Sequence, residues 1–539
     1  MKKLSLGALA ALVGSALVAG VVPQSPVSAA TAATATKLVT GTGSSNPSAA
    51  VGDAGLGEAW GVGTTKVGST RWTVFESSAN NLVANDTNAA SDIFVTDGTT
   101  ITRLSVSAAG AQGSVGQNSF DPVICASGRK VAFTTENEWD QTDSNGAQDV
   151  YVIDRDADAD GVMDEFSQAG SVTVQVVSVS YNTDLGEFDI AFTGAGSPAI
   201  SDDCSKVAFS TEQDFTLDDL NFSPDVYLRD VTSAAAVVTG VSGSGTAVTY
   251  TAANSFAVGD LVTISGVSPT AYNLVNVPVT ARTSTTFTIA NPTTTAFVSG
   301  GVAVKTPKTT ARWVSTYASG GSAGGGYLPA LNTDGTKVVF ATESTDVVSS
   351  SGTVGGLVLS TVGVSTVSAQ YLTRTPAGAA STATLADNER TAAVTPNGRC
   401  VAFKADRGYD LVASNGGAAQ GIYLWDNRGT TPVITLVSKD SRGIAASSAA
   451  NPRISDDCRF IAYQSNDEFL SSIDNNRKTD VFLYDTITRE TTIMSKNAAG
   501  TASSDGVSSV GALDWDPATG TGVVQVLSNA SNLGGAAGG

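Results

Sequence analysis

The chain has 539 residues, 41% of them hydrophobic, and carries 50 Asp and Glu against 30 Lys and Arg, a formal net charge of −20. This acidity, with a pI near 4.3, argues against nucleic acid and anionic membranes as partners, because both attract clustered Lys and Arg. There is no His, which excludes Ser-His-Asp hydrolysis and His-ligated zinc, since both need imidazole.

Residues 1–29 read as a cleavable export signal. Lys2 and Lys3 precede an apolar stretch over 4–22, and small residues up to Ala29 offer a cleavage site. A membrane anchor is the alternative, but several Gly in the stretch weaken it. No second run approaches the roughly 20 apolar residues of a membrane helix. We therefore expect a secreted, cell-surface or periplasmic protein, with no membrane insertion after signal cleavage.

One phrase recurs along the rest of the chain. It reads GRKVAFTTENEWDQTDSNGAQDVYVIDRD from Gly128, CSKVAFSTEQDFTLDDLNFSPDVYLRD from Cys204 and CRFIAYQSNDEFLSSIDNNRKTDVFLYD from Cys458. Each copy predicts a tight turn, an apolar strand, a polar loop and a second strand that opens with Asp. The apolar strand recurs seven times, around Phe75, Phe133, Phe209, Phe340, Phe403, Tyr463 and Val526.

Each unit has two further short strands, one before the turn (SPAI, NPRI) and one after the strand that opens with Asp (VITLVSK, TTIMSK). Each unit therefore has four strands. Four-stranded units at a period of about 60 residues predict an all-β fold, a single β-propeller. Seven blades are favoured and six are the alternative, because the first and last copies are the weakest. A strand near 36–41 is expected to complete the last blade, and a flexible tail to end the chain. The propeller then covers 30–232 and 309–539.

The motifs D-G-x-x-[VI]-A-F and D-[VI]-[FY]-[LV]-x-D, over roughly 55–535, resemble the TolB-type, WD-like propeller repeat of exported bacterial proteins. The resemblance implies a propeller fold and no particular function. TolB itself carries a further N-terminal domain, for which this chain leaves no room. A role in the Tol system is therefore not expected.

An insertion at 233–308 interrupts blade three, between VYLRDV and ARWVST. Its short strands, separated by Gly and Pro turns, predict a small β-barrel or sandwich of five or six strands. The segment FAVGDLVTISGV and the strands after it resemble a module of phage tail fibres and bacterial surface proteins. That resemblance implies surface display or interaction.

The segment DADADGVMDE is the strongest candidate site. Asp156, Asp158 and Asp160 alternate before a Gly, and Asp164 and Glu165 follow. Such carboxylates can converge on Ca²⁺, which takes six to eight oxygen ligands. The segment begins like an EF-hand loop but lacks its final Glu, and it is similar to the Asp-rich loops of thrombospondin-type repeats. A structural calcium site in blade two is expected, with a solvated acidic hairpin tip as the alternative.

Other acids recur at fixed positions of the repeat. An Asp opens the third strand of four blades, and recurrence at one position favours a repeated structural hydrogen bond over catalysis. Blades four and five lack this Asp. Acids in the preceding loops recur in the same way and are interpreted similarly. The opening residues are Asp92, Asp149, Asp225 and Asp480, and the loop residues are Asp86, Asp143 and Asp474.

Aromatic residues in the long loops could form a glycan-binding platform. Four of them, however, each follow the Phe or Tyr of the second strand by six positions, which favours packing. These are Trp139, Phe215, Tyr409 and Phe469, while Trp60, Trp425 and Trp515 do not follow this register.

The four cysteines of the chain predict disulfides in an exported protein. Each lies at the first hairpin of a blade, and adjacent blades bring these turns together. Of the three possible pairings we therefore expect Cys125–Cys204 and Cys400–Cys458. A Cys-based zinc site is the less favoured alternative, because it needs closer spacing.

No nucleophile motif stands out, and no catalytic residue is assigned. The sequence favours a non-catalytic scaffold that binds a protein or glycan partner at the cell surface. A structural subunit of a surface array or adhesin is one alternative, and a carboxylate-dependent glycan hydrolase is another. Strand order predicts that the long loops form an acidic rim on one face. The calcium loop, the insertion and the cysteine turns should share the other face.

Overall fold

The computed structural model describes residues 63–533 with internal gaps. The gaps are 141–142, 169–170, 183–186, 217, 220, 222, 232–234, 307–310, 318–323, 345, 349–355, 364–365, 380, 382–391, 407–409, 414–419, 498, 529 and 531. The predicted signal (1–29), the predicted closing strand (36–41) and the end of the tail (534–539) lie outside the described residues.

Blades one to three are antiparallel sheets of four strands. Blade one has β1 (Gly63–Val67), β2 (Thr70–Ser77), β3 (Asp92–Thr96) and β4 (Ile101–Arg103). Blade two has β5 (Ser119–Ile124), β6 (Lys130–Thr135), β7 (Asp149–Asp154) and β8 (Thr173–Val176). Blade three has β11 (Ala195–Ile200), β12 (Lys206–Thr211), β13 (Asp225–Asp230) and β21 (Arg312–Trp313), after a hairpin of β9 (Val179–Asn182) and β10 (Glu187–Ile190).

Blades four to six repeat the pattern. Blade four has β22 (Tyr327–Leu331), β23 (Lys337–Thr342), β24 (Gly356–Val362) and β25 (Val367–Tyr371). Blade five has β26 (Ala392–Val394), β27 (Cys400–Asp406), β28 (Gln420–Asp426) and β29 (Val433–Leu436). Blade six has β30 (Ala450–Ile454), β31 (Phe460–Ser465), the short 3₁₀ helix η2 (Glu468–Leu470), β32 (Asp480–Asp485) and β33 (Glu490–Ile493).

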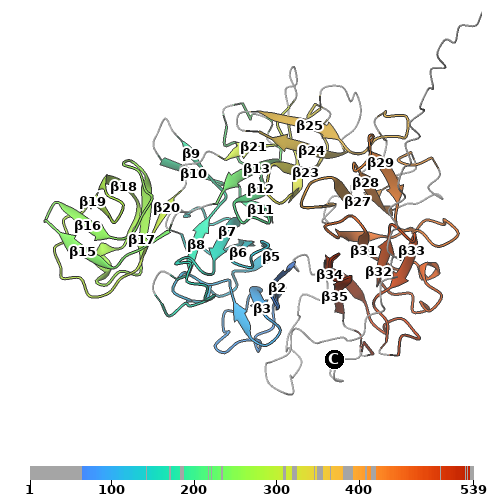
Figure 1. Ribbon diagram of the computed structural model, residues 1–539, viewed down its shortest axis with the longest axis horizontal. Coiled ribbons are helices and arrows are strands. Elements are labelled where there is room, and N and C mark those ends of the chain that lie inside the picture. The colour runs from blue at the N-terminus through green and yellow to red at the C-terminus, as the bar shows by residue number, and fades with distance from the viewer. Residues whose placement is uncertain are drawn as a thin grey trace, which may run out of the picture.

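The seventh copy forms a hairpin of two strands, β34 (Ser508–Asp516) and β35 (Thr521–Ser528), between blades six and one (Figure 1). The favoured count of seven blades is therefore wrong, and the described residues form six four-stranded blades, the stated alternative. Since β35 corresponds to the recurring apolar strand, the repeat is genuine there, but the described residues supply no third or fourth strand after it. Trp515 packs on Phe460 of blade six, with ring centres 4.6 Å apart.

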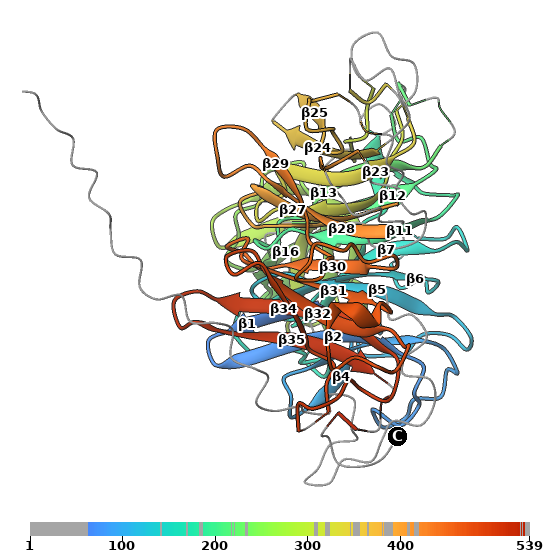
Figure 2. The same cartoon turned by 90° about the vertical axis from the view of Figure 1, so that its right-hand side faces the viewer.

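On its other side the hairpin meets blade one, where β34 contacts β1 (Figure 2). Arg71 forms an ion pair with Asp514. The side-chain amide of Gln525 donates a hydrogen bond of 2.6 Å to the Thr73 hydroxyl. These contacts close the ring between the first and last described strands.

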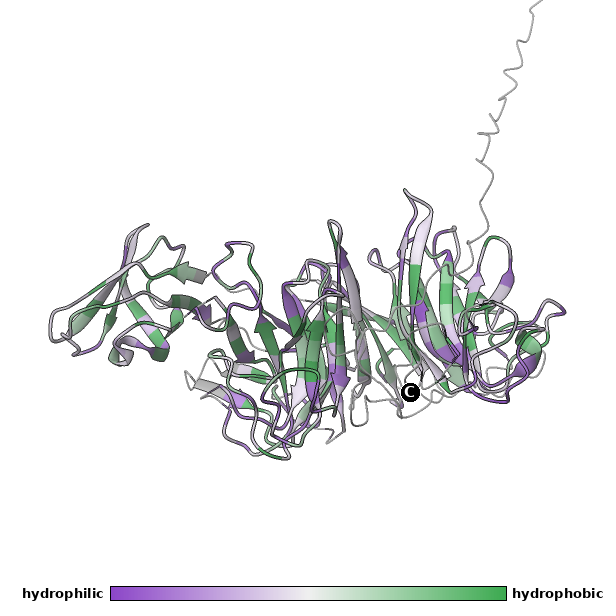
Figure 3. Ribbon diagram, turned by 90° about the horizontal axis from the view of Figure 1, so that it is seen from below, coloured by the Kyte–Doolittle hydropathy of each residue, from purple (hydrophilic) through white to green (hydrophobic). Residues whose placement is uncertain are grey.

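Each blade packs its faces on the neighbouring blades. One hydrophobic cluster joins Val74 and Ile93 of blade one to Phe133 and Tyr151 of blade two. The second strand is covered on both sides, so β6 is buried along its whole length. This explains the run of three apolar residues, VAF, in the middle of β6, since a strand with no solvent face needs no alternation. Figure 3 shows these apolar strands inside the propeller.

The insertion forms a separate seven-stranded sheet that projects from the propeller between β13 and β21 (Figures 1 and 3). In spatial order it contains β14 (Ala235–Val237), β20 (Val302–Thr306), β17 (Leu261–Ser265), β18 (Leu274–Arg282), β19 (Thr286–Ala290), β16 (Ala247–Thr251) and β15 (Gly240–Gly243), with the 3₁₀ helix η1 (Thr270–Tyr272). Its core is its own and includes Tyr250, Phe256 and Phe287. Among the described helices none has the length and apolar character needed to cross a bilayer.

Candidate functional sites

The innermost strands of the blades and of the hairpin surround a central channel. Its volume is about 600 Å³, and its wall is formed by β1, β5, β11, β22, β26, β30 and β34. Its lining side chains are mostly apolar, but backbone groups make the wall as polar as it is apolar, and few of its side chains are charged. A concave site with a small number of placed polar side chains is the usual form of a ligand-binding site.

Four of the innermost strands carry a bulge at an X-Pro step that shifts the pairing with the second strand. Pro cannot donate to the ladder, so a bulge accommodates it. The residue before each Pro has φ between 50° and 56°. Three of these residues line the channel. The bulge residues are Asp121, Ser197, Leu328 and Asn451. The Pro inside the SPAI and NPRI strands is the sequence signal for this feature, although no bulge was predicted from it.

The charged groups of the channel include Glu76, Asp121 and Arg453. Ser91 donates a hydrogen bond of 2.8 Å to Glu76. Burial raises the pKa of Glu76, and the charge of Asp121 adds to the rise. Arg453 donates to the carbonyl of Gly511. Glu76 and Asp121 come from neighbouring blades and not from opposite walls, unlike the facing pair expected of a glycan hydrolase.

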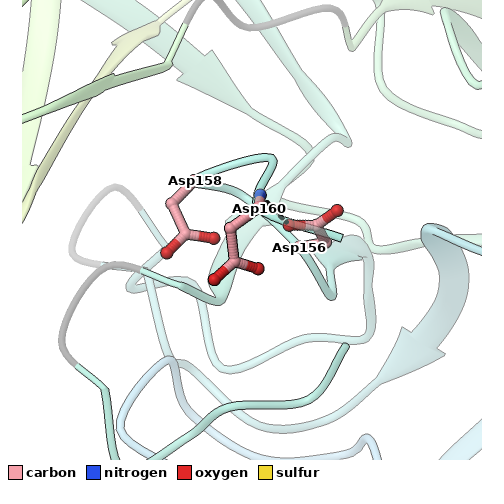
Figure 4. A group of neighbouring side chains, drawn as sticks. All are labelled: Asp156, Asp158 and Asp160. Carbon is pink, nitrogen blue, oxygen red and sulfur yellow. Dashed lines mark hydrogen bonds between the residues drawn. The ribbon is translucent and has the colours of Figure 1, made fainter. Parts of the chain in front are cut away.

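The acidic loop after β7 brings three of its predicted ligands together. Carboxylate oxygens of Asp156, Asp158 and Asp160 lie within 4.8 Å of one another (Figure 4). One oxygen of Asp158 and one of Glu165 are shielded from solvent without a hydrogen-bond partner. Partial burial and the charges of the three Asp raise the pKa of Glu165, although its carboxylate is not one of the three that lie within 4.8 Å of one another. Hard oxygen donors left unsatisfied in this way fit a cation such as Ca²⁺.

Asp164 has a different role in the same loop. Both of its carboxylate oxygens accept hydrogen bonds from Arg155, through Nε at 2.8 Å and Nη2 at 2.5 Å. The buried Arg155 also donates to the Gly128 carbonyl and stacks on Trp72 of blade one, 4.2 Å from the ring centre. Asp164 therefore anchors the loop to blades one and two, and four of the five predicted ligands remain available.

The Asp that opens the third strand has the expected structural role in all four blades. In blade two, Asp149 accepts hydrogen bonds from Asn145 and Ser178, and the Ser178 hydroxyl accepts one from the Val150 amide. The same Asn–Asp–Ser network recurs in the other three blades. It ties the loop to the fourth strand, which explains why Asn precedes each Asp by four positions.

Blades four and five have Gly at this position. Thr373 and Ser438 still accept the hydrogen bond from the strand amide. A Cβ atom at Gly356 would clash with the Thr373 hydroxyl oxygen, and one at Gly421 would lie 3.1 Å from the Tyr423 ring. Close packing at both positions is consistent with Gly in place of Asp.

The loop acids lie beside the opening Asp residues but have different partners. Asp143 accepts a hydrogen bond of 2.6 Å from the Tyr151 hydroxyl. Asp219, a loop acid that was not predicted from the sequence, accepts one from Tyr227. Asp86 forms an ion pair of 3.0 Å with Arg103. Asp474 is buried, yet neither of its carboxylate oxygens has a hydrogen-bond partner.

The loop aromatics divide into two groups. Trp139 packs edge-on against Tyr151, and Phe215 against Tyr227, which confirms their role as packing anchors. Phe469 departs from this prediction, because 39% of its surface is exposed. The position of Tyr409, and that of Trp60, lie outside the described residues. Trp425 is buried between blades four and five.

Both predicted disulfides are present, Cys125–Cys204 between blades two and three and Cys400–Cys458 between blades five and six. The Cα atoms are 5.2 Å and 6.0 Å apart. Cys204 and Cys458 occupy the turn position with positive φ. The hairpin of blade four has Gly335 there.

No protein-family model matches the chain, and no curated protein matches its sequence. Similar solved structures include TolB from Acinetobacter baumannii, at 10% identity and a TM-score of 0.34, over 74% of this chain and 58% of TolB. The propeller domain of the Trilobed protease from Pyrococcus furiosus is 8% identical, with a TM-score of 0.35, over 87% of this chain and 98% of that domain. The acylaminoacyl peptidase of Pyrococcus horikoshii is 9% identical, with a TM-score of 0.32, over 86% of this chain and 49% of the peptidase. At these values the likeness carries no functional argument, and the propeller fold rests on the sheet topology.

Proposed function

We propose that this β-propeller is an exported, non-catalytic scaffold that binds a protein or small ligand through its central channel. The carrying observation is the channel of about 600 Å³, walled by every innermost strand and carrying few charged groups. Bulges at the X-Pro steps reshape this wall in four blades. Bulges often mark functional positions, because they redirect side chains.

The test compares the wild type with two variants. Ala393→Trp places a large side chain in the channel, and Thr99→Trp places the same side chain on an exposed turn as a control. Each protein is immobilised and exposed to the secreted and envelope fractions of the source cells, and retained components are quantified. The proposal expects one component that the wild type and Thr99→Trp retain and Ala393→Trp loses. Equal retention by all three proteins would place binding elsewhere and contradict the channel proposal.

We also propose that Asp156, Asp158, Asp160 and Glu165 hold a structural Ca²⁺. The unsatisfied oxygens of Asp158 and Glu165 support this. The ion would offset the repulsion among these carboxylates. It would also hold the loop against blade one, because Arg155 binds Asp164 of the loop and stacks on Trp72. Calcium should raise the unfolding temperature of the wild type and leave that of Asp158→Asn unchanged. Asp97→Asn, an acid on the exposed turn of blade one, is the control that should respond like the wild type.

The projecting insertion favours one further candidate, a subunit of a cell-surface array or adhesin. Its separate core and its position outside the ring leave its surface available for contacts. The resemblance of its sequence to tail-fibre and surface modules supports the same interpretation. Small-angle scattering with and without calcium tests it, since an array subunit should self-associate and a simple scaffold should stay monomeric.

A further inference from the structure

A second concave site lies at the rim of the propeller, apart from the channel. It has a volume of about 940 Å³ and lies between the loop after β29, the loop after β31 and the outer strand β33. We call it the rim pocket and define it by Arg442, Asp467, Phe469, Asp474, Arg477 and Glu490. None of these residues lines the channel.

Asp474 gives this pocket an uncompensated acid. Its side chain is buried, with 6% of the residue exposed, and neither carboxylate oxygen has a hydrogen-bond partner. Burial beside Asp480 raises the pKa of Asp474 to about 6. The Ser503 hydroxyl and the Asn476 amide act in the opposite direction, but neither reaches the carboxylate with the geometry of a hydrogen bond. A buried carboxylate without a partner is costly, so the site favours a cation.

The repeat explains why the acid is unpaired only here among the four described loops. In blades two and three, Tyr151 and Tyr227 donate their hydroxyl to the equivalent Asp. Blade six has Phe482 at that position, which has no hydroxyl. Blade one also has Phe there, but Arg103 pairs with its loop Asp.

Phe469 is the second departure of blade six from the repeat. The equivalent Trp139 and Phe215 pack against the aromatic residue of the third strand. In blade six Leu470 is buried instead, with 5% exposure, and Phe469 is left 39% exposed in the pocket. An exposed ring next to a buried acid is the arrangement that binds organic cations, through the ring face and the charge together.

The other charges of the pocket agree with this. Its two arginines are engaged, since Arg442 lies 2.7 Å from Asp440 and Arg477 lies 4.0 Å from Glu468. Asp440 and Glu468 are the partners of these arginines, so Asp467, Asp474 and Glu490 remain as the surplus acids of the pocket.

We propose that the rim pocket binds an arginine side chain of a partner polypeptide, with Phe469 under the guanidinium and Asp474 as its counter-charge. Arginine fits better than lysine, because its planar head stacks on a ring and pairs with a carboxylate at the same time. Reaching Asp474 requires a small outward shift of the loop, because both of its carboxylate oxygens are shielded from solvent. This inference stands independently of the channel proposal.

The probes are acetyl-Gly-Arg-Gly-amide and its Lys and Glu counterparts, with binding followed by saturation-transfer NMR at neutral pH. The Arg peptide should bind, the Lys peptide more weakly, and the Glu peptide not at all. Asp474→Asn and Phe469→Ala should each weaken Arg-peptide binding at least tenfold. Asp143→Asn removes the equivalent acid of blade two, and Ile487→Ala an exposed apolar group of blade six, so both should bind normally.

Folding of every variant is checked by its unfolding temperature, and Asp474→Asn should not lower it, because it removes an unpaired buried charge. Equal weakening by Asp143→Asn would mean general attraction to an acidic protein and would overturn the proposal. Normal binding by Asp474→Asn and Phe469→Ala would do the same. If Asp474→Asn instead removes a bound Ca²⁺, the occupant is a metal and the proposal is wrong.

Discussion

The Ser315 hydroxyl donates a hydrogen bond to the Asp225 carboxylate, although the two residues are 90 positions apart and the whole insertion lies between them. Ser315 also accepts the Val226 amide at 2.9 Å, as the corresponding Ser does in blade two. Blade three therefore completes the same internal network as the uninterrupted blades. The insertion adds a unit to the propeller without replacing any of it.

Removal of residues 235–306 should leave the propeller folded. The first and last strands of the insertion pair with each other, Ala235 opposite Val304, so a linker of a few Gly can bridge the gap. We expect cooperative unfolding within a few degrees of the wild type, measured by circular dichroism. The excised segment alone should also fold, because its core is self-contained. Loss of cooperativity in the shortened chain would mean that the insertion supports the ring.

Ser178→Ala should destabilise the protein more than Ser438→Ala. The first change removes a donor to the buried Asp149 and an acceptor for the Val150 amide, whereas Ser438 serves only an amide, since Gly421 replaces the Asp. We expect losses of about 2 and about 1 kcal/mol in the free energy of unfolding. Guanidinium unfolding of the two variants in parallel gives the comparison. Equal losses would show that the Asp–Ser bond adds nothing.

Stability should fall as pH rises from 5 to 8. Burial raises the pKa of Asp149 to about 7 from an ordinary value of 3.8. The folded protein thus binds more protons than the unfolded chain between these values, and stability is lost as pH rises through the folded pKa. Asp149 alone should account for about 2–3 kcal/mol over this interval. Denaturation of the wild type and Asp149→Asn at several pH values measures it, and an unchanged slope in the variant would contradict the assignment.

Loss of either disulfide should destabilise the ring. The bridged residues are separated by 79 and 58 positions, so each bond constrains a long loop of the unfolded chain. The double change Cys125→Ala with Cys204→Ala, or Cys400→Ala with Cys458→Ala, should cost about 2–5 kcal/mol. Equilibrium unfolding measures the cost. Reductant breaks both disulfides, so it should lower the free energy of unfolding of the wild type below that of either variant measured without reductant.

The fold and the cysteine pairs could be predicted because the repeat places equivalent residues at equivalent points of each blade. With Cys204 in the first turn of blade three, the favoured partner was the Cys in the same turn of the neighbouring blade. The blade count could not be predicted as well. GVVQVLS forms β35 as expected, but a full blade also needs a third and a fourth strand, and only β34 pairs with β35 in the described residues.

The rim pocket shows a second limit. Phe469 was interpreted from its distance to Tyr463, which matches the packed aromatics of other blades. From Tyr463 to Asp480 the chain has one position more than from Phe133 to Asp149. The extra residue lets the loop form η2 and bury Leu470, so the ring is displaced. The Pro bulges were equally visible in the sequence, but which channel-lining side chains they bring together depends on all the blades.

Among the described residues, the junction between the hairpin and blade one is crossed neither by a disulfide nor by the continuing chain. The hairpin meets blade one there through the Arg71–Asp514 ion pair, the Gln525–Thr73 hydrogen bond and the contacts of β34. Under mechanical load, as at a surface exposed to flow, we expect rupture to begin at this seam. The cross-linked pairs, blades two with three and blades five with six, should then separate last.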